Sequence, residues 1–304
     1  MSGPTASGKT ALALALARQL GGTGSVEVVN FDSVQLYRDF DLGTAKPTTS
    51  ELEEVPHHLI GVADAASPWT AGEYARRARP IVADILRRGK LPILVGGTGF
   101  YLRALLDGLS ALPQSSRELR HRLAAHPRLH ELLRRLDPGA AARIAPGDRE
   151  KIVRAVEVRL LTRRPVADAW QAAPREPFAE IRALKFALRP ERAQLYERID
   201  RRAEIMFSGG IQEETRRLLR RYPADVRIWI AHGYKQACDI VLRGVPEAQA
   251  LAEAQQEQRR YAKRQWTWLR SDPDYHWLDG FGDDPVIQQT AANQTKAALN
   301  LQAD

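Results

Sequence analysis

The sequence is poor in cysteine and in long hydrophobic runs, and each absence excludes a class of protein. Its 304 residues contain one cysteine, Cys238, which cannot form an internal disulfide or a cysteine-based zinc site. Uncharged apolar runs such as 91–95 fall far short of the roughly 20 residues that cross a bilayer. Met1 is followed almost at once by a glycine-rich loop, which is not a signal peptide. A cytoplasmic protein with no membrane partner is therefore expected.

Positive charge is what the sequence has in excess. It carries 45 Lys and Arg residues against 37 Asp and Glu residues, a formal net charge of +8. Hydrophobic residues make up 44% and charged residues 27%, a normal globular composition that excludes a disordered chain. The charge favours a phosphate-rich partner, but many basic proteins bind no nucleic acid.

The hydrophobic pattern of the first hundred residues is typical of a parallel sheet covered by helices. Strands are predicted at 26–31 and 91–95, and helices at 9–20 and 71–88. From 113 to 173 the β-branched runs disappear and Arg, Leu, Ala and Glu dominate, which predicts a helical insert.

After the insert, residues 181–188 could return the chain to the sheet. Further helices are predicted at 191–207, 212–221 and 246–270. Residues after about 283 are polar, and we expect them to fray.

A phosphate-binding loop opens the sequence. Residues 3–10 read G-P-T-A-S-G-K-T and fit the pattern G-x-x-x-x-G-K-[ST], followed directly by a predicted helix. Main-chain N–H groups of such a loop wrap a phosphate, the lysine neutralises it, and the final hydroxyl holds Mg²⁺. The loop residues expected at the phosphate are Gly3, Pro4, Thr5, Ala6, Ser7, Gly8, Lys9 and Thr10, with Thr10 as the Mg²⁺ ligand.

A loop of this kind normally follows a buried strand, yet only Met1 and Ser2 precede Gly3. A strand needs about five or six residues. We therefore expect the natural protein to start upstream, with a first strand that this sequence lacks.

Two polar residues follow the predicted strands. Asp32 opens D-S-V-Q-L-Y-R after the strand at 26–31, and Thr98 lies in G-G-T-G after the strand at 91–95. Ligands of doubly wound sheets bind at the carboxyl ends of strands, so both residues should lie near the phosphate loop. Asp32 could bind Mg²⁺, act as a general base or cap a turn, and Thr98 could face a ligand or cap a turn.

Histidines are not expected to form a metal site. His57 and His58 are adjacent, so in a strand they point to opposite faces. His126 and His130 are separated by Pro127, and no carboxylate or cysteine completes a ligand set.

A basic helical face is predicted near the end of the chain. Arg259, Lys263, Trp266 and Arg270 recur at i, i+4, i+7 and i+11, and Arg264 flanks them. Cations contact phosphates and exposed aromatic rings stack on bases, so this face could bind RNA. A basic helix that is simply solvated explains the pattern equally well.

Together these motifs resemble those of the bacterial tRNA dimethylallyltransferases, also called tRNA isopentenyltransferases. The resemblance continues through nearly the whole chain in the order expected for the family. Besides the phosphate loop, it rests on D-S-V-Q-L-Y-R (32–38), D-L-G-T-A-K-P (41–47), V-P-H-H-L-I (55–60), G-K-L-P-I-L-V-G-G-T-G-F-Y-L (89–102), D-R-E-K-I-V-R-A-V-E-V (148–158), G-Y-K-Q (233–236) and A-K-R-Q-W-T-W-L-R (262–270).

The resemblance implies transfer of a dimethylallyl group from dimethylallyl diphosphate to N6 of the adenosine 3′-adjacent to the anticodon, position 37 of tRNA. The phosphate loop would then hold the donor's diphosphate instead of ATP, with Mg²⁺ on Thr10. By the same resemblance Asp32 is the general base, Thr98 lies near donor and acceptor, and Ser33, Val34 and Gln35 help to receive the flipped base.

The resemblance also implies an α/β fold, a P-loop NTPase-like parallel sheet flanked by helices with an inserted all-helical domain. The core would span 1–112 and 178–304, and the insert 113–177 would contact tRNA, with the enzyme acting as a monomer on the anticodon stem-loop. The residues carried over as tRNA contacts are Asp32, Ser33, Val34, Gln35, Thr98, Arg120, Glu150, Lys151, Ile152, Val153, Arg154, Lys235, Arg259, Lys263, Arg264 and Arg270.

Three other functions use some of the same features. An ATP-dependent small-molecule kinase would share the phosphate loop but has no need of a long basic and aromatic helix. An adenylate isopentenyltransferase would perform the same chemistry on a free nucleotide, which leaves the insert unexplained. A regulatory nucleotide switch that binds RNA is disfavoured because no guanine-reading N-K-x-D motif is present.

Overall fold

The computed structural model describes residues 1–113 and 116–300. The chain divides into two compact units, one made of Met1–Leu105 with Ala179–Asp304 and the other of Leu106–Phe178. The smaller unit begins seven residues before the predicted insert at 113–177, because the segment after α4 (Gly99–Leu106) already belongs to it.

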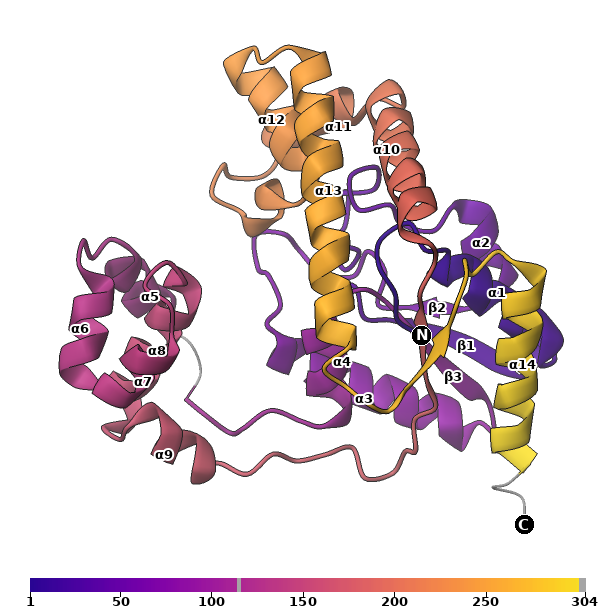
Figure 1. Ribbon diagram of the computed structural model, residues 1–304, viewed down its shortest axis with the longest axis horizontal. Helices are drawn as coiled ribbons and strands as arrows, with labels where there is room; N and C mark the ends of the chain where they lie inside the picture. Colours follow the sequence, from indigo (N-terminus) through magenta and orange to yellow (C-terminus); the bar gives the residue numbers. More distant parts are fainter. Residues whose placement is uncertain (114–115, 301–304) are drawn as a thin grey trace. The chain divides into compact units, whose positions relative to one another are not determined.

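The larger unit is built on short parallel strands (Figure 1). In one sheet β1 (Val26–Asn30) lies between β2 (His57–His58) and β3 (Leu91–Val95). In the other, β4 (Lys185–Leu188) pairs with β5 (Tyr275–Leu278). All five residues of β1 are buried, as expected for a parallel strand covered on both faces. The two strands predicted first are confirmed, and the strand predicted at 181–188 forms only from Lys185 onward.

Met1 and Ser2 lie between the two sheets. Ser2 forms a parallel bridge with Ala187, and its carbonyl accepts the Leu188 N–H at 3.0 Å. On the other side, the Gly96 N–H donates to the Met1 carbonyl at 3.3 Å. The residues before the phosphate loop thus take part in the strand pairing that such loops normally follow, while the upstream start stays a prediction.

Helices cover the sheets and extend away from them (Figure 1). α13 packs along α10 and α12, and α1 packs against α14. The helix predicted at 246–270 is confirmed as the long α13. The helices of this unit are α1 (Lys9–Gln19), α2 (Thr49–Glu54), α3 (Ala71–Arg87), α4, α10 (Arg192–Ser208), α11 (Ile211–Leu219), α12 (Tyr234–Arg243), α13 (Glu247–Leu269) and α14 (Pro285–Asn300), with short 3₁₀ turns at Gly22–Gly24 and Arg227–Ile230.

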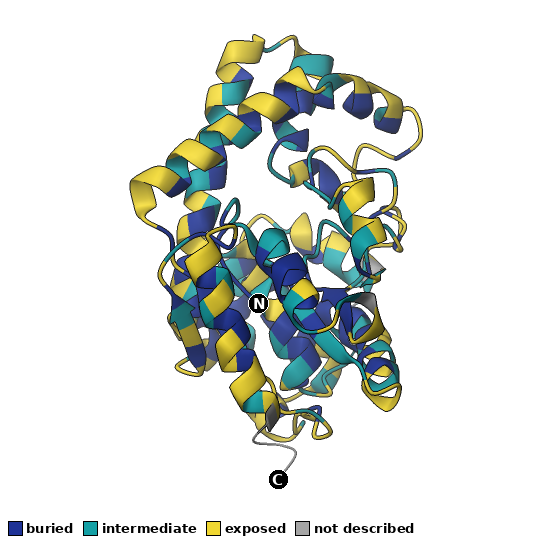
Figure 2. Cartoon of the chain, turned by 90° about the vertical axis from the view of Figure 1, so that its right-hand side faces the viewer, coloured by how far each residue is buried: buried dark blue, intermediate teal, exposed yellow. Residues whose placement is uncertain are grey.

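The expectation that the chain frays after about residue 283 is wrong. Residues Pro285–Asn300 form α14, and its Ile287, Ala291 and Ala292 are buried in the core that joins α1 to the sheets. The composition is polar because only one narrow side of α14 is buried, an alternation of buried and exposed residues that Figure 2 shows along the helices.

The smaller unit contains helices joined by loops, and no strand, within its described residues. Its helices α5 (Arg117–Ala124), α6 (Leu129–Leu136), α7 (Pro138–Arg143), α8 (Arg149–Thr162) and α9 (Val166–Gln171) enclose a core that includes Leu123, Leu133, Ile152 and Val156. Across the described residues of both units, no helix is long and apolar enough to cross a membrane.

Candidate active site

The phosphate loop is formed between Ser2 and α1. Gly8 caps α1 with a φ of 85°, a conformation that favours glycine, and a Cβ there would lie 2.9 Å from the main-chain nitrogen of Gly282. The Lys9 ammonium folds back over the loop and donates to the carbonyls of Pro4 at 2.8 Å and Gly3 at 3.2 Å. The lysine side chain therefore joins the two ends of the loop through these hydrogen bonds.

The charges around this loop favour an anion. Burial lowers the pKa of Lys9 to about 8, against the attraction of the Asp32 carboxylate and with a contribution from Arg202. Burial also lowers the pKa of the Arg202 guanidinium. Because burial disfavours both positive charges, a bound phosphate group would raise both pKa values again.

Polar atoms without partners surround the same loop. Within the described residues, Ser7 Oγ, Arg202 Nε and Gln258 Nε2 are buried and accept or donate no hydrogen bond. Arg202 also donates to the Thr5 hydroxyl and, at 2.9 Å, to Gln258 Oε1. Buried polar groups are normally satisfied, so these atoms indicate a polar ligand or water at the loop.

Asp32 presents one free carboxylate oxygen. Its Oδ1 accepts the Val34 N–H at 3.1 Å, and its own N–H donates to Asn30 Oδ1 at 2.9 Å. In the described part of the chain, no donor hydrogen-bonds to Oδ2, which lies 3.2 Å from the place of a Cβ on Gly97. The turn thus fixes the carboxylate and leaves one oxygen available to take a proton.

Thr98 lies against the D-S-V-Q motif, as predicted. Its Oγ1 accepts the Ser33 N–H at 3.0 Å and donates to Ser33 Oγ at 3.1 Å. Tyr261 of α13 lines the same pocket as Thr98, and burial raises the pKa of that tyrosine. The carboxyl ends of β1 and β3 therefore bring the two predicted catalytic residues to one place.

A pocket with a volume of about 190 Å³ opens beside Thr98. Helix α13 forms one wall and the G-G-T-G turn another, and Arg264 lies 5.5 Å from the ring centre of Tyr261. Its lining residues are Ser2, Gly3, Phe31, Gly96, Gly97, Thr98, Gly99, Tyr261, Arg264, Gln265, Trp268 and Leu269.

Comparison with known proteins assigns this arrangement to a family. Residues 35–272 match the family model described as IPP transferase, and residues 1–60 match a model described as isopentenyl transferase. A tRNA dimethylallyltransferase from Koribacter versatilis is 51% identical, over 94% of this chain and 93% of that protein. One from Solibacter usitatus is 46% identical, over 98% of each chain.

The chain belongs to the tRNA dimethylallyltransferase family. It is a transferase with the α/β fold of that family. The crystal structure of the tRNA isopentenylpyrophosphate transferase of Bacillus halodurans is 33% identical and covers 100% of this chain, with a TM-score of 0.70.

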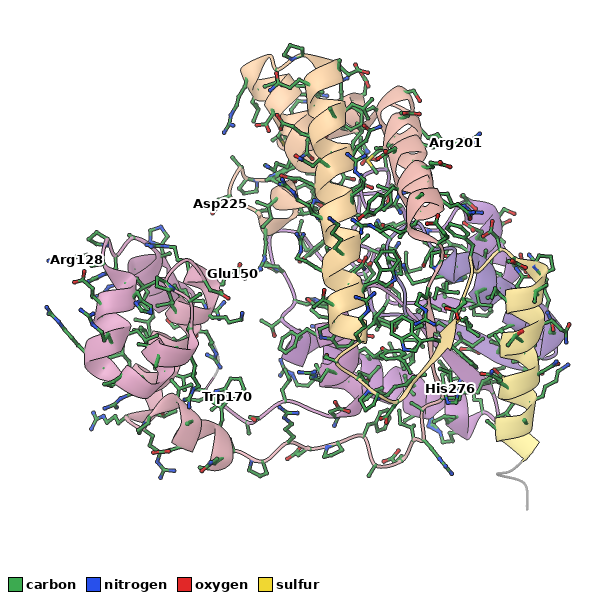
Figure 3. The ribbon with its side chains drawn as sticks, in the orientation of Figure 1. Arg128, Glu150, Trp170, Arg201, Asp225 and His276 are labelled. Atoms are coloured by element: carbon green, nitrogen blue, oxygen red, sulfur yellow. The ribbon has the colours of Figure 1, made fainter. Side chains whose placement is uncertain are left out.

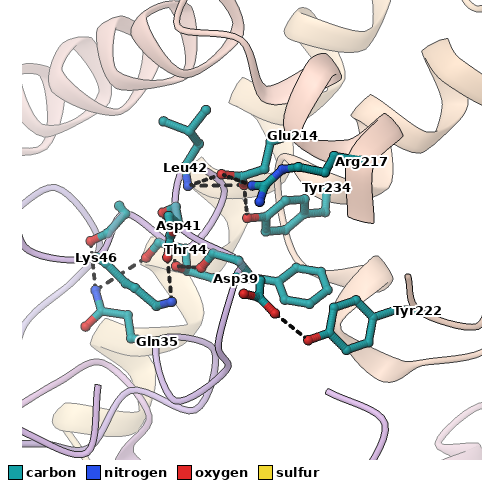
Figure 4. A network of polar contacts seen from close by, with 12 residues as sticks. Gln35, Asp39, Asp41, Leu42, Thr44, Lys46, Glu214, Arg217, Tyr222 and Tyr234 are labelled. Atoms are coloured by element: carbon teal, nitrogen blue, oxygen red, sulfur yellow. Dashed lines mark hydrogen bonds and ion pairs between the residues drawn. The ribbon is translucent and has the colours of Figure 1, made fainter. Parts of the chain in front are cut away.

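The family motif G-T-A-K-P is fixed by a polar network rather than by the phosphate loop (Figure 4). Gln35 Nε2 donates to the carbonyls of Ala45 at 2.8 Å and Thr44 at 3.3 Å, so this predicted base-receiving residue holds the motif in place. The buried Glu214 accepts from the Tyr234 hydroxyl and from the Leu42 N–H at 3.2 Å. The network therefore fastens residues 39–46 to α11 and α12.

The predicted basic face of α13 is only partly at the surface. Lys263, Arg264 and Arg270 are exposed. Trp266 is 8% exposed and packs in a core cluster with residues of α10, and Arg259 forms an ion pair with Asp200 of α10 at 2.6 Å. The prediction of one continuous surface face is wrong, because the boundary between the packed and the solvated side of α13 runs through it.

Lys235, another tRNA contact predicted in this unit, pairs with Glu257 of α13 at 2.7 Å.

In the smaller unit, Arg120 and Arg154 share one carboxylate. Glu157 is fully buried and accepts from Arg154 Nη1 at 2.7 Å and from Arg120 Nε at 3.4 Å. The shared carboxylate orients both guanidinium groups while leaving them partly exposed.

The segment 150–154 does not present all its side chains to a partner. Glu150 and Lys151 are exposed, and Glu150 projects from the surface of the smaller unit (Figure 3). Ile152 and Val153 are 1% and 8% exposed and form part of the core. The expectation that these two side chains contact tRNA is therefore corrected, because they hold α8 against its neighbours.

Three residues that sequence reasoning missed lie at the phosphate loop. Arg202 comes from α10, and Gln258 and Gln265 come from α13; Arg202 is 197 and Gln265 is 260 residues from Thr5 in the sequence. The sequence signal that could have found the two glutamines is their spacing, because residues seven apart lie on the same side of a helix. The structure shows that this side is the buried one.

The donor set suits a magnesium ion only together with a phosphate ligand. Thr10 offers a hydroxyl in the first turn of α1 and Asp32 a carboxylate, and no group of three or more His, Cys, Asp or Glu side chains that could hold a metal occurs in the described residues. His57 and His58 have separate partners, the Val55 carbonyl and the Glu27 carboxylate. Mg²⁺ commonly takes one or two protein oxygens, with water and substrate phosphates completing its shell.

Proposed function

We propose that this enzyme transfers a dimethylallyl group from dimethylallyl diphosphate to N6 of the adenosine 3′-adjacent to the anticodon, position 37 of tRNA, and releases diphosphate. The observation that carries the proposal is the convergence of a closed phosphate loop, a half-free carboxylate on Asp32 and the Thr98 hydroxyl. All three come from one chain, so no second subunit is needed to supply them, and a monomeric enzyme is part of this proposal. A tRNA acceptor also implies action in the cytoplasm.

The phosphate loop binds the donor through its diphosphate. In the reaction the bond between the prenyl C1 and the diphosphate oxygen breaks, and its electron pair leaves with the diphosphate. Lys9, Arg202 and the main-chain N–H groups of the loop surround this developing charge, which is the main electrostatic aid a protein can give. Mg²⁺, held by Thr10 and the diphosphate, would neutralise part of that charge.

Asp32 accepts the proton that the acceptor loses. The adenine N6 amine forms the new bond to C1, and its proton passes to the available Oδ2 of Asp32 while Oδ1 stays bound to Val34. Thr98 and Ser33 hold each other at the carboxyl ends of β3 and β1, where the base must be received after it leaves its stack.

The acceptor is bound largely through its backbone. Lys263, Arg264 and Arg270 are exposed on the larger unit, and Arg120 and Arg154 are oriented by Glu157 on the smaller one. Cations spread over this much of the chain suit a long polyanion better than a free nucleotide.

Labelled dimethylallyl diphosphate tests the proposal. The purified protein is incubated with the labelled donor and either tRNA or AMP, with and without ATP. We expect label in tRNA, none in AMP, and no dependence on ATP. Label in AMP would instead identify an adenylate isopentenyltransferase, and ATP hydrolysis coupled to phosphorylation of a small molecule would identify a kinase.

A further inference from the structure

Gln265 of α13 connects the two loops of the active site. Its Oε1 accepts the main-chain N–H of Thr5 at 2.8 Å, and its Nε2 donates to the carbonyl of Gly97 at 3.0 Å. The side chain is 7% exposed and lines the pocket beside Thr98. An amide is suited to this place because it carries an acceptor and donors on one planar group.

Gly97 is fitted between Gln265 and the proposed base. A Cβ on Gly97 would lie 2.4 Å from Gln265 Nε2 and 3.2 Å from Asp32 Oδ2. Only a glycine allows the amide to approach the G-G-T-G turn so closely. The position of Gln265 therefore sets how near Gly97, and with it Thr98, stands to Asp32.

Thr5 is held from two sides. While Gln265 binds its main-chain N–H, Arg202 donates to its hydroxyl, and Arg202 is itself held by Gln258, one of the residues on the same side of α13. The Thr5 N–H is thus committed to α13 rather than to phosphate. The loop is fixed at its start, which leaves the later N–H groups for the diphosphate.

We propose that Gln265 is a positioning residue that sets the distance between the donor-binding loop and the acceptor-binding turn. This inference rests on the proposed function, since the two loops hold donor and acceptor only if prenyl transfer is the reaction. The exposed Lys263 and Arg264 precede Gln265 directly on α13, so the helix that meets tRNA also holds the reacting groups together.

Gln265→Leu removes both hydrogen bonds without adding charge. We expect kcat to fall about 10²-fold, the usual effect of a misplacement near 1 Å, with a tRNA Kd close to that of the natural chain. Gln256→Leu is the matched control, because Gln256 lies exposed on the same helix and should leave kcat unchanged. A kcat for Gln265→Leu equal to that of the control would overturn the proposal.

Gln265→Glu gives a readout that a purely structural role would not move. The ionised carboxylate can still accept from Thr5 but repels the Gly97 carbonyl, whereas the protonated carboxyl can donate to that carbonyl. The rate of this variant relative to the natural enzyme should therefore rise as the pH is lowered, and a ratio that does not change with pH would contradict the proposal. This variant also decides the question if Gln265→Leu fails to fold.

Hydrogen exchange separates this inference from the proposed function. The peptide that contains Thr5 should exchange its amide hydrogens faster in Gln265→Leu than in Gln256→Leu, whatever the reaction is. If the natural enzyme prenylates no tRNA while this difference is seen, the proposed function is wrong but Gln265 does hold the phosphate loop. Equal exchange in both variants together with normal tRNA prenylation would show that Gln265 does not hold the loop, and would leave the proposed function intact.

Discussion

A carboxylate with one oxygen fixed and the other available is the feature that separates a base from a capping residue. Asp32 Oδ1 is held by the Val34 N–H, so the turn alone would explain its presence, but Oδ2 faces Gly97 of the acceptor turn. From the sequence these two roles were alternatives, and the geometry allows one residue to fill both.

Asp32→Asn tests the role of base and keeps the turn. The amide oxygen can still accept from Val34, but the side chain can no longer take a proton. We expect kcat to fall by about 10²–10⁴ while the tRNA Kd changes little. Single-turnover rates and filter binding measure the two quantities, and a rate near that of the natural enzyme would assign Asp32 to the turn only.

Lys9 predicts a pH dependence of donor binding. Its pKa is lowered to about 8 in the free enzyme, so above that pH the free enzyme loses the charge that meets the diphosphate. The affinity for dimethylallyl diphosphate should therefore be full below about pH 8 and fall as the pH rises further. Calorimetric titration of the donor across this range measures it, and Lys9→Met should bind more weakly and lose this pH dependence.

Helix α13 carries arginines with different roles on its two sides, one side exposed to solvent and the other packed against α10. Arg264 is exposed and lies over Tyr261, whereas Arg259 is paired with Asp200 of α10. Only the first is free to exchange solvent for a phosphate.

Arg264→Ala and Arg259→Ala form a matched pair. Arg264→Ala should weaken tRNA binding and reduce the salt slope of binding by about one. Arg259→Ala should leave that slope close to the natural value and lower the melting temperature instead, because it leaves Asp200 without its partner. An equal loss of tRNA affinity in both variants would show that the packed side of α13 also meets RNA.

The terminal helix α14 is a structural element of the core. Ala291 is fully buried against α1, so Ala291→Asp should lower the free energy of unfolding by about 3–5 kcal/mol, as an uncompensated buried charge does. Gln294→Glu, on the exposed side of the same helix, should have little effect. Urea unfolding of both variants measures the difference, and equal stability would mean that α14 does not pack as described.

Across the elements, prediction succeeded where the signal was local. A few residues are enough to predict these elements: the β-branched runs indicate β1 and β3, and the repeat of Ala and Leu without a helix breaker indicates α1. α14 was missed because a helix with one narrow buried side looks polar in composition. Trp266 was misjudged because periodicity places a residue on a side of a helix but cannot tell which side is covered.

For the whole molecule, the sequence motifs predicted which loops meet but not what holds them together. Asp32, Thr98 and the phosphate loop come together because each follows a segment that takes part in parallel strand pairing: β1, β3 and Ser2, respectively. Residues that follow parallel strands lie at the same edge of a sheet. Arg202 and Gln265 contact the same loop although they are 197 and 260 residues from Thr5 in the sequence, and no spacing rule connects residues at that distance. Part of the excess positive charge is exposed on each unit, whereas other cations, such as Arg259 with Asp200, form ion pairs within the chain.

Mass analysis of the tRNA anticodon loop tests directly whether the enzyme transfers a dimethylallyl group to adenosine 37. A tRNA with adenosine at position 37, and a second with guanosine there, are incubated with enzyme and dimethylallyl diphosphate without ATP and then digested. We expect one added dimethylallyl group on the fragment that holds adenosine 37, and none on the guanosine tRNA. A prenyl group on another nucleotide, or an unchanged fragment with an enzyme that binds both substrates, would contradict it.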